Sequence, residues 1–247
     1  MNSKKTNNLI SVENAQEIIF SKFKKLETIK KKLIDSSGFI LEKEIKALFD
    51  LPNKNNSAMD GFAVRHEDLE PNKSLKVVGR VGAEAITDYV LKKDEALRIM
   101  TGSGIPEGAD SVVPFEKTNN NPHKGNDFPD SVLINETVKK GDNIRLSGQD
   151  YKFGETVVKG GMLIDPPIVG AIASFGINEV SVIRKPLVSI ISTGNELVMP
   201  GDKLKEGQIY DSNSFAISAA IKNSGADFKM HRILSDNKED VDKLYED

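Results

Sequence analysis

The sequence lacks the residues on which several classes of reactive site depend. It contains no cysteine, which excludes disulfides, thiolate metal sites and cysteine nucleophiles. Its three histidines, His66, His123 and His231, are scattered along the chain, so we do not expect a histidine-based zinc site. Chemistry must therefore rely on carboxylates, hydroxyls, basic side chains, backbone amides or a bound cofactor.

Long apolar segments and a strong charge of one sign are also missing. No apolar run approaches the roughly 20 residues that span a bilayer, and the polar start of the chain lacks the apolar core of a signal peptide. The formal net charge is -3, which gives no basic field to attract nucleic acid or anionic lipid. We therefore expect a cytoplasmic protein without a membrane or nucleic-acid partner.

The composition is that of a globular chain that begins with a helix. Its 247 residues are 38% hydrophobic and 29% charged, which fits one large domain or two ordinary ones. From Ser11 to Ile34, apolar residues follow the three-to-four spacing of one buried helix face. Ser11 is a suitable N-cap. The lysines of this segment are most simply its solvated face, since no aromatic residues alternate with them as in a nucleic-acid patch.

The middle of the chain has a β-rich pattern, and its C-terminal part alternates strands with helices. Turn-forming residues separate short β-rich runs at 76–80, 96–100, 111–115 and 132–134. A helix from Pro166 to Phe175 and a strand at 180–183 follow. The remaining pattern predicts strands at 187–191 and 228–234, a helix at 214–224 and a last helix from about Asp236. We therefore predict a multidomain fold of mixed α/β and β class, with a long N-terminal helix, an inserted β-rich domain and an incomplete Rossmann-like α/β domain.

Two polar runs lie in the β-rich part. In the run 56–65, a tight turn explains the pair Asp60-Gly61. It does not explain why the amide of Asn56, the hydroxyl of Ser57 and the carboxylate of Asp60 are gathered in one short run. The run 98–110 is a glycine-rich loop whose backbone amides could approach an anion. Its spacing fits neither the dinucleotide fingerprint nor the P-loop, so a plain connection between strands is the alternative.

Further polar runs follow at 141–150, 192–196 and 208–214. Arg145 offers a two-pronged donor for a phosphate or oxyanion and Asp150 a partner for a cation or a base, although a salt bridge between the two explains them equally well. The run 192–196 ends a buried strand, where α/β sheets bind ligands. The run 208–214 leads into a helix N-terminus that favours an anion, with ordinary N-capping as the alternative.

Taken together and in order, these runs resemble the molybdopterin molybdotransferase family, which includes MoeA and the gephyrin E domain. The motifs are NSAMDGFAVR, RIMTGSGIPEGADSVV, GDNIRLSGQD and STGNELVMPGDKLKEGQIYDSN. The resemblance implies an N-terminal dimerisation domain formed by 1–54 and 146–184, an inserted β-rich domain at 55–145, and a molybdopterin-binding-like domain at 185–247. It implies a homodimer whose site lies between domains of the two subunits.

The implied reaction inserts molybdate into adenylylated molybdopterin and releases AMP, with Mg2+ required and the molybdopterin adenylyltransferase as a further partner. The resemblance assigns catalytic roles to Asp60, Thr101, Arg145, Asp150, Glu196 and Asp236. Arg145 would bind an oxyanion, and Glu196 and Asp236 would hold magnesium or order water. The cofactor-binding residues would be Ser57, Ser192, Thr193, Gly194, Asn195, Asp211, Ser212 and Asn213, with Asn195 standing where many relatives have aspartate.

The sequence also departs from the family. The family's GG-x-S-x-G loop, the lysines that contact molybdate and the fourth, β-barrel domain are not found before Asp247. We therefore expect the 247-residue chain to be a truncated portion that is inactive or nearly so by itself. Two alternatives are a non-catalytic dimeric scaffold of the same fold and a generic nucleotide-binding α/β protein, which would leave the β-rich insert unexplained.

Overall fold

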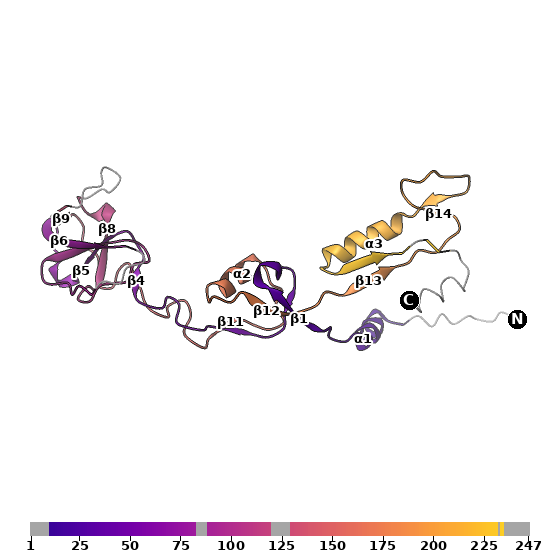
Figure 1. Cartoon of the computed structure of the whole chain (residues 1–247), viewed down its shortest axis with the longest axis horizontal. Helices are drawn as coiled ribbons and strands as arrows, with labels where there is room; N and C mark the ends of the chain where they lie inside the picture. Colours follow the sequence, from indigo (N-terminus) through magenta and orange to yellow (C-terminus); the bar gives the residue numbers. More distant parts are fainter. Residues whose placement is uncertain (1–9, 83–87, 120–128, 232, 235–247) are drawn as a thin grey trace. The chain divides into compact units, whose positions relative to one another are not determined.

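The computed structural model describes residues 10–82, 88–119, 129–231 and 233–234 (Figure 1). The chain divides into two compact units: a β-rich unit, Ile45–Val157, and a bipartite unit formed by Met1–Glu44 and Val158–Asp247. The β-rich unit extends beyond both predicted ends of the insert. Asp236 and the helix predicted to begin there lie outside the described residues. Among those residues, no helix is long and apolar enough to cross a bilayer.

A five-stranded sheet forms the body of the β-rich unit, in the order β8-β5-β7-β6-β9. Its strands are β5 (Gly61–Val64), β6 (Lys73–Val81), β7 (Glu95–Ile99), β8 (Ser111–Pro114) and β9 (Ser131–Ile134). The four β-rich runs of the sequence are thus confirmed as strands. Strand β6 pairs with β7 in parallel, and the other pairs are antiparallel.

The sheet has a well-buried apolar interior. Phe62, Val64, Leu75, Val113, Val132 and Ile134 are fully buried in one cluster. Ala63, Ile99 and Val112 are fully buried in a second cluster, packed with the largely buried Val81, Leu91 and Leu97. Neighbouring residues of β5 thus enter different clusters, because successive side chains of a strand point to opposite faces. This packing holds the ends of the strands, and the loops attached to them, in fixed positions.

Short elements complete the β-rich unit. Strand β4 (Asn56–Ser57) pairs antiparallel with β10 (Ile144–Arg145), and a separate two-stranded sheet joins β3 (Ile45–Lys46) and β11 (Thr156–Val158). Two 3-10 helices, η2 (His66–Asp68) and η3 (Phe115–Lys117), follow β5 and β8. The β4–β10 pair matters for function because it joins two of the polar runs.

The predicted N-terminal helix is wrong in length. Helix α1 spans only Val12–Lys22, none of its residues is buried, and Phe23 is its C-cap. Ser11 is its N-cap, as predicted. The segment that follows forms β1 (Thr28–Lys32), which pairs antiparallel with β12 (Glu179–Ile183). Pairing with a distant strand prevails here over the helical spacing of the sequence, and the β-branched Thr28 and Ile29 favour it.

The bipartite unit also contains β2, η1 and α2, and the start of α2 agrees with the sequence prediction. Strand β2 (Ile40–Leu41) extends the sheet to the order β1-β12-β2, and η1 (Leu33–Asp35) follows β1. Helix α2 (Pro166–Ala173) begins with proline in its first turn, as predicted, and Asp165 is its N-cap. Ser174 is its C-cap. Gly176, two residues further on, has a φ of 73°, in the left-handed region that favours glycine.

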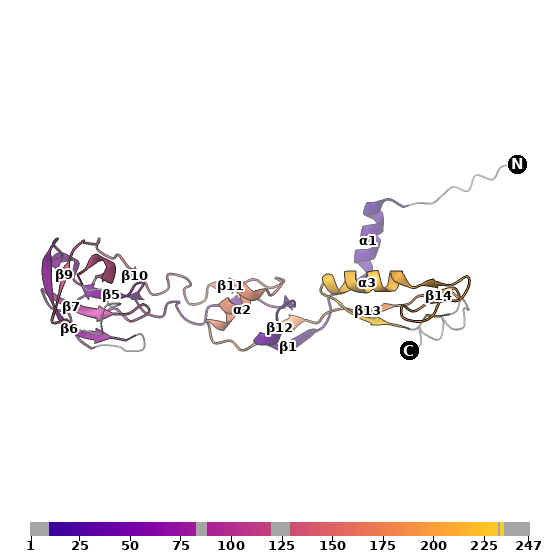
Figure 2. The ribbon, with the colours of Figure 1, turned by 90° about the horizontal axis from the view of Figure 1, so that it is seen from above.

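The last part contains the predicted β-α-β arrangement. Strand β13 (Leu187–Ile190) pairs in parallel with β16 (Asp227–Met230), and helix α3 (Ser212–Asn223) packs on both (Figure 2). Strands β14 (Leu197–Val198) and β15 (Ile209–Tyr210) form a second parallel pair. The segment after β13 therefore begins at the carboxyl end of a parallel strand, as the sequence predicts.

Candidate functional site

The structure brings two of the polar runs together at Asp60 and Thr101. One carboxylate oxygen of Asp60 accepts hydrogen bonds from both the backbone N–H and the hydroxyl of Thr101, each at 2.7 Å. Both residues are exposed, so this acid and this hydroxyl are accessible to a ligand. The two residues are 41 positions apart in the sequence. The contact depends on β5 and β7, which are neighbours in the sheet.

The amides of the glycine-rich loop are already used within the protein. Asp60 accepts the N–H of Thr101, the Ser57 carbonyl accepts that of Gly102 at 2.8 Å, and the Met100 carbonyl accepts that of Ser103 at 3.0 Å. These three N–H groups therefore do not form an anion nest. The loop instead exposes the Thr101 hydroxyl and the Asp60 carboxylate.

Ser57 and Gly61 shape the run that contains Asp60. Ser57 is 1% exposed, and its hydroxyl donates to the Met59 carbonyl at 2.6 Å. A Cβ on Gly61 would come within 2.1 Å of the Val113 carbonyl oxygen. Ser57, which was predicted to bind cofactor, thus has its hydroxyl committed to the turn. Gly61 is required because β5 and β8 approach closely at this point.

The third polar run joins the first through the β4–β10 pair. Arg145 lies opposite Asn56 in this pair, and the Ala58 N–H donates to the Asn143 carbonyl at 2.9 Å. Arg145 forms an ion pair with Asp150, which is the salt bridge left open by the sequence; the two side chains are 43% and 39% exposed. The positive charge of Arg145 is therefore already balanced by a neighbouring carboxylate.

A pocket of about 390 Å³ lies beside this ion pair, and Arg145, Asp150 and Asn56 line it. The carboxamide oxygen of Asn56 is buried and has no hydrogen-bond partner among the described residues. The sequence marks the Asn56 amide as one of the polar groups of the run 56–65, but it assigns Asn56 no binding role.

In the α/β part, Ser192 and Asp211 meet at the start of α3. Asp211 is the helix N-cap and accepts from the Ser214 N–H at 3.1 Å, and its other carboxylate oxygen accepts from the Ser192 hydroxyl at 2.6 Å. The Ser192 hydroxyl also contacts that of Ser214. The hydrogen bond from Ser192, together with those from the N-terminal turn of α3, lowers the pKa of Asp211. Both predicted ligands thus take part in a helix cap.

The loop after β13 is held by Leu234, which follows β16 in the chain. Thr193 forms a parallel bridge with Leu234, and the Gly194 N–H donates to the Leu234 carbonyl at 3.1 Å. A Cβ on Gly194 would lie 2.9 Å from both carboxylate oxygens of Glu196. Glycine at this position therefore leaves room for the Glu196 carboxylate over the loop.

The other predicted ligands of this part are open to solvent. Asn195 and Glu196 are exposed in the loop after β13, and Ser212 and Asn213 are exposed in the first turn of α3. Among the described residues, no group of three or more histidine, aspartate or glutamate side chains could hold a metal ion. Glu196 is thus the only member of the predicted magnesium pair that the described residues contain.

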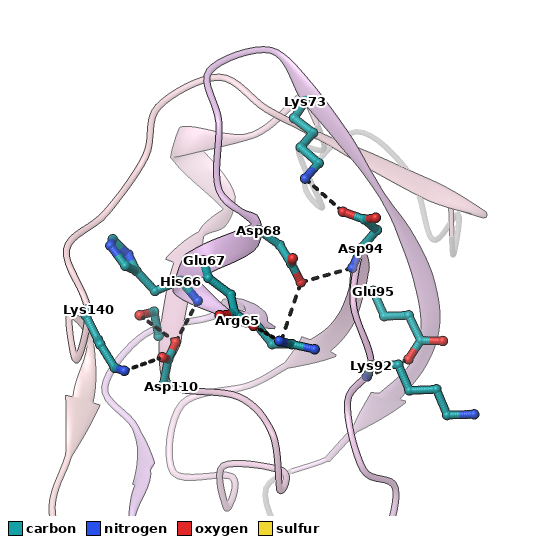
Figure 3. Close-up of polar contacts among 11 residues, drawn as sticks. Arg65, His66, Glu67, Asp68, Lys73, Lys92, Asp94, Glu95, Asp110 and Lys140 are labelled. Atoms are coloured by element: carbon teal, nitrogen blue, oxygen red, sulfur yellow. Dashed lines mark hydrogen bonds and ion pairs between the residues drawn. The ribbon is translucent and has the colours of Figure 1, made fainter.

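A second polar cluster lies on the β-rich unit, outside the predicted site. Arg65 and the backbone N–H of Asp94 both contact the buried Asp68 carboxylate, at 3.7 and 2.9 Å (Figure 3). Lys73 lies 2.8 Å from Asp94, and this contact lowers the pKa of Asp94. Because every group in this chain of contacts has a partner, the cluster serves to fix η2 and the turn before β7.

Comparison with known proteins gives the same result for both parts of the chain. Residues 10–176 match the family described as MoeA N-terminal region (domain I and II), and residues 189–245 match one described as probable molybdopterin binding domain. A Staphylococcus epidermidis protein named molybdopterin molybdenumtransferase is 36% identical over 235 residues, covering 93% of this chain and 54% of that protein. The Staphylococcus aureus protein of that name is 34% identical with the same coverage.

Solved structures are also similar. Two structures of the molybdopterin biosynthesis MoeA protein from Pyrococcus horikoshii match 96% of this chain, with TM-scores of 0.75 and 0.83 at 32% and 28% identity. The chain covers 60% and 63% of those two proteins, and it spans about half the length of the curated relatives it matches (54%). The first family match alone covers most of the chain, and the structures share its fold. The chain belongs to the MoeA family.

Proposed function

We propose that this chain acts in molybdenum cofactor biosynthesis, in the insertion of molybdate into adenylylated molybdopterin with release of AMP. The observation that supports this most is the contact between Asp60 and Thr101, at 2.7 Å. It gathers an acid and a hydroxyl, from two runs that resemble the family's motifs, on one exposed surface. Relatives named molybdopterin molybdenumtransferase have this reaction type in their name.

The proposed roles follow from the geometry of each residue. Asp60 fixes the direction of the Thr101 hydroxyl by accepting a hydrogen bond from it, so the hydroxyl oxygen is left to accept from a ligand or water. Arg145, already paired with Asp150, supplies donors without a large excess of positive charge. Glu196, exposed directly before β14, supplies a further carboxylate. In this proposal the chain binds and orients the substrate and exchanges protons with it.

The described residues do not by themselves make a magnesium site. Mg2+ takes six oxygen ligands and usually keeps several waters, bound through one or two carboxylates and substrate phosphates. Glu196 is one such carboxylate, and its predicted companion, Asp236, lies outside the described residues. We therefore propose Glu196 as a contributor to magnesium binding.

The family resemblance also leads us to propose a homodimer and delivery of substrate by the molybdopterin adenylyltransferase. Sedimentation velocity of the chain at micromolar concentration tests the first proposal. A dimer is the expected result. A monomer would remove any shared site between two copies of this chain.

The proposed function predicts a preference for the pterin part of the substrate. We expect the chain to bind adenylylated molybdopterin at least tenfold more tightly than AMP or ATP in equilibrium dialysis, which corresponds to about 1.4 kcal/mol. A generic nucleotide-binding protein would bind all three alike. Equal affinities, or no binding by a chain that circular dichroism shows to be folded, would contradict the proposal.

A further inference from the structure

One pocket of the β-rich unit combines an aromatic ring with several polar groups. Its volume is about 390 Å³, within the roughly 300–1,000 Å³ that small-molecule sites occupy. Its lining includes Phe49, Leu51, Pro52, Asn56, Arg145 and Asp150. Phe49 is 40% exposed, so the pocket offers an aromatic surface to an incoming ligand.

Asn56 is the unexplained residue of this pocket. Its backbone is fixed by β10 on one side and by a bridge to Gly104 on the other, so the side chain has a defined origin. The Oδ1 atom is buried and accepts no hydrogen bond from the described residues. Buried acceptors are nearly always satisfied in folded proteins, because an unpaired one is destabilising. A ligand with an N–H group at this position would remove that penalty.

The charges of the pocket select against a bound dianion. Arg145 is the cation among the lining residues named above, and Asp150 already balances it. A carboxylate next to a phosphate or molybdate would repel it. The polar groups on which this argument rests are one donor, Arg145, and two acceptors, the Asp150 carboxylate and the Asn56 oxygen; the amide of Asn53, which also lines the pocket, can both donate and accept. This pattern fits a neutral planar ring with neighbouring N–H groups and a carbonyl oxygen.

We propose that this pocket binds the pyrimidine edge of the pterin ring, an assignment that rests on the proposed function. Asp150 and Asn56 accept hydrogen bonds from the ring's 2-amino group and the adjacent ring N–H. Arg145 donates to the neighbouring carbonyl oxygen, and Phe49 packs on the ring face. Because Oδ1 of Asn56 is covered in the free protein, binding of the ring requires side chains of the pocket to shift.

The test compares two rings that differ in one group. Lumazine has a carbonyl oxygen where pterin has the 2-amino group. This oxygen would face the acceptor oxygens of Asp150 and Asn56, to which it cannot donate a hydrogen bond. The chain has no tryptophan, so the fluorescence of either ring can be followed directly during a titration. We expect pterin to bind at least about tenfold more tightly than lumazine, as one lost hydrogen bond to a buried group implies.

Variants identify the residue responsible. Asn56→Ala should weaken pterin binding about five- to tenfold and reduce the preference over lumazine. Asn56→Asp keeps an acceptor in place and should retain that preference. Asn135→Ala changes an exposed asparagine of the same unit, outside the pocket, and should bind like the unmodified chain. Circular dichroism checks that each variant folds.

The outcomes separate this inference from the proposed function. If adenylylated molybdopterin binds the chain and its Asn56→Ala variant equally well, the pocket assignment is wrong while the proposed function stands. If AMP, but not pterin, binds in an Asn56-dependent way, the pocket recognises the adenine ring and the assignment is again wrong. If a folded chain binds neither pterin nor adenylylated molybdopterin, both fail.

Discussion

At the scale of single residues, the account depends most on Asp60. Its carboxylate is the acceptor for two hydrogen bonds from Thr101. We expect Asp60→Ala to lower the free energy of unfolding by about 1 kcal/mol, since the contact is charge-assisted but exposed. Glu116→Ala, at an exposed position of the same unit, should stay within about 0.5 kcal/mol. Urea unfolding of both variants measures the difference; equal midpoints would show that the Asp60 contact contributes nothing to stability.

Asp211 gives a prediction about pH. Hydrogen bonds from Ser192 and from the N-terminal turn of α3 lower its pKa from the ordinary 3.8. A carboxylate whose pKa is lower in the folded state stabilises the fold above its unfolded-state pKa, and this contribution is lost as pH falls through the folded-state pKa. Stability should therefore decline below about pH 3.8.

Asp211→Asn serves as the control for that pH dependence. The amide keeps an N-cap oxygen but does not titrate, so the variant should lose less stability over the same range of pH. Urea unfolding followed by far-UV circular dichroism at several acidic pH values gives the comparison. If both proteins lose the same stability in this range, the acid dependence originates elsewhere.

At the scale of elements, the close approach of β5 and β8 makes a sharp prediction. A Cβ on Gly61 would lie 2.1 Å from the Val113 carbonyl oxygen, and that oxygen belongs to the backbone, which cannot simply rotate away. We expect Gly61→Ala to destabilise the β-rich unit by roughly 1–3 kcal/mol or more. Gly82→Ala is the matched control, because a Cβ there meets nothing within 4 Å. Similar thermal midpoints for both variants would contradict this packing.

The elements that local pattern could predict differ from those it could not. Strands β6 to β9 and the β13-α3-β16 arrangement follow from alternating or apolar runs and from turn residues beside them. The segment after Lys22 has helical spacing, yet it forms β1 because β12, far away in the sequence, pairs with it. A single-sequence pattern contains no information about such a partner.

The same limit applies to the candidate site. The residue types of Asp60, Thr101 and Arg145 mark them as candidates. Their mutual contacts depend on sheet pairing across many residues. The glycine-rich loop is an example: its spacing permits an anion-binding nest of N–H groups. In the structure, Asp60 and Ser57 accept hydrogen bonds from two of those N–H groups. The sequence gives Asn56 no binding role because an acceptor without a hydrogen-bond partner is visible only once its neighbours are in place.

At the scale of the whole molecule, the candidate residues are distributed over two compact units. Asp60, Thr101, Arg145 and Asp150 belong to the β-rich unit, and Ser192, Glu196 and Asp211 to the bipartite unit. The chain covers 54% of the Staphylococcus epidermidis transferase. The most direct test of function therefore supplies the remainder from that relative.

The central claim is tested by a hybrid in which this chain replaces the matching part of the Staphylococcus epidermidis protein. The measurement is molybdate-dependent release of AMP from adenylylated molybdopterin, followed by chromatography. The account predicts AMP release well above a control without molybdate, at least tenfold slower with Asp60→Asn and unchanged with Glu116→Gln. A folded hybrid that releases no AMP, or one in which Asp60→Asn has no effect, would contradict it.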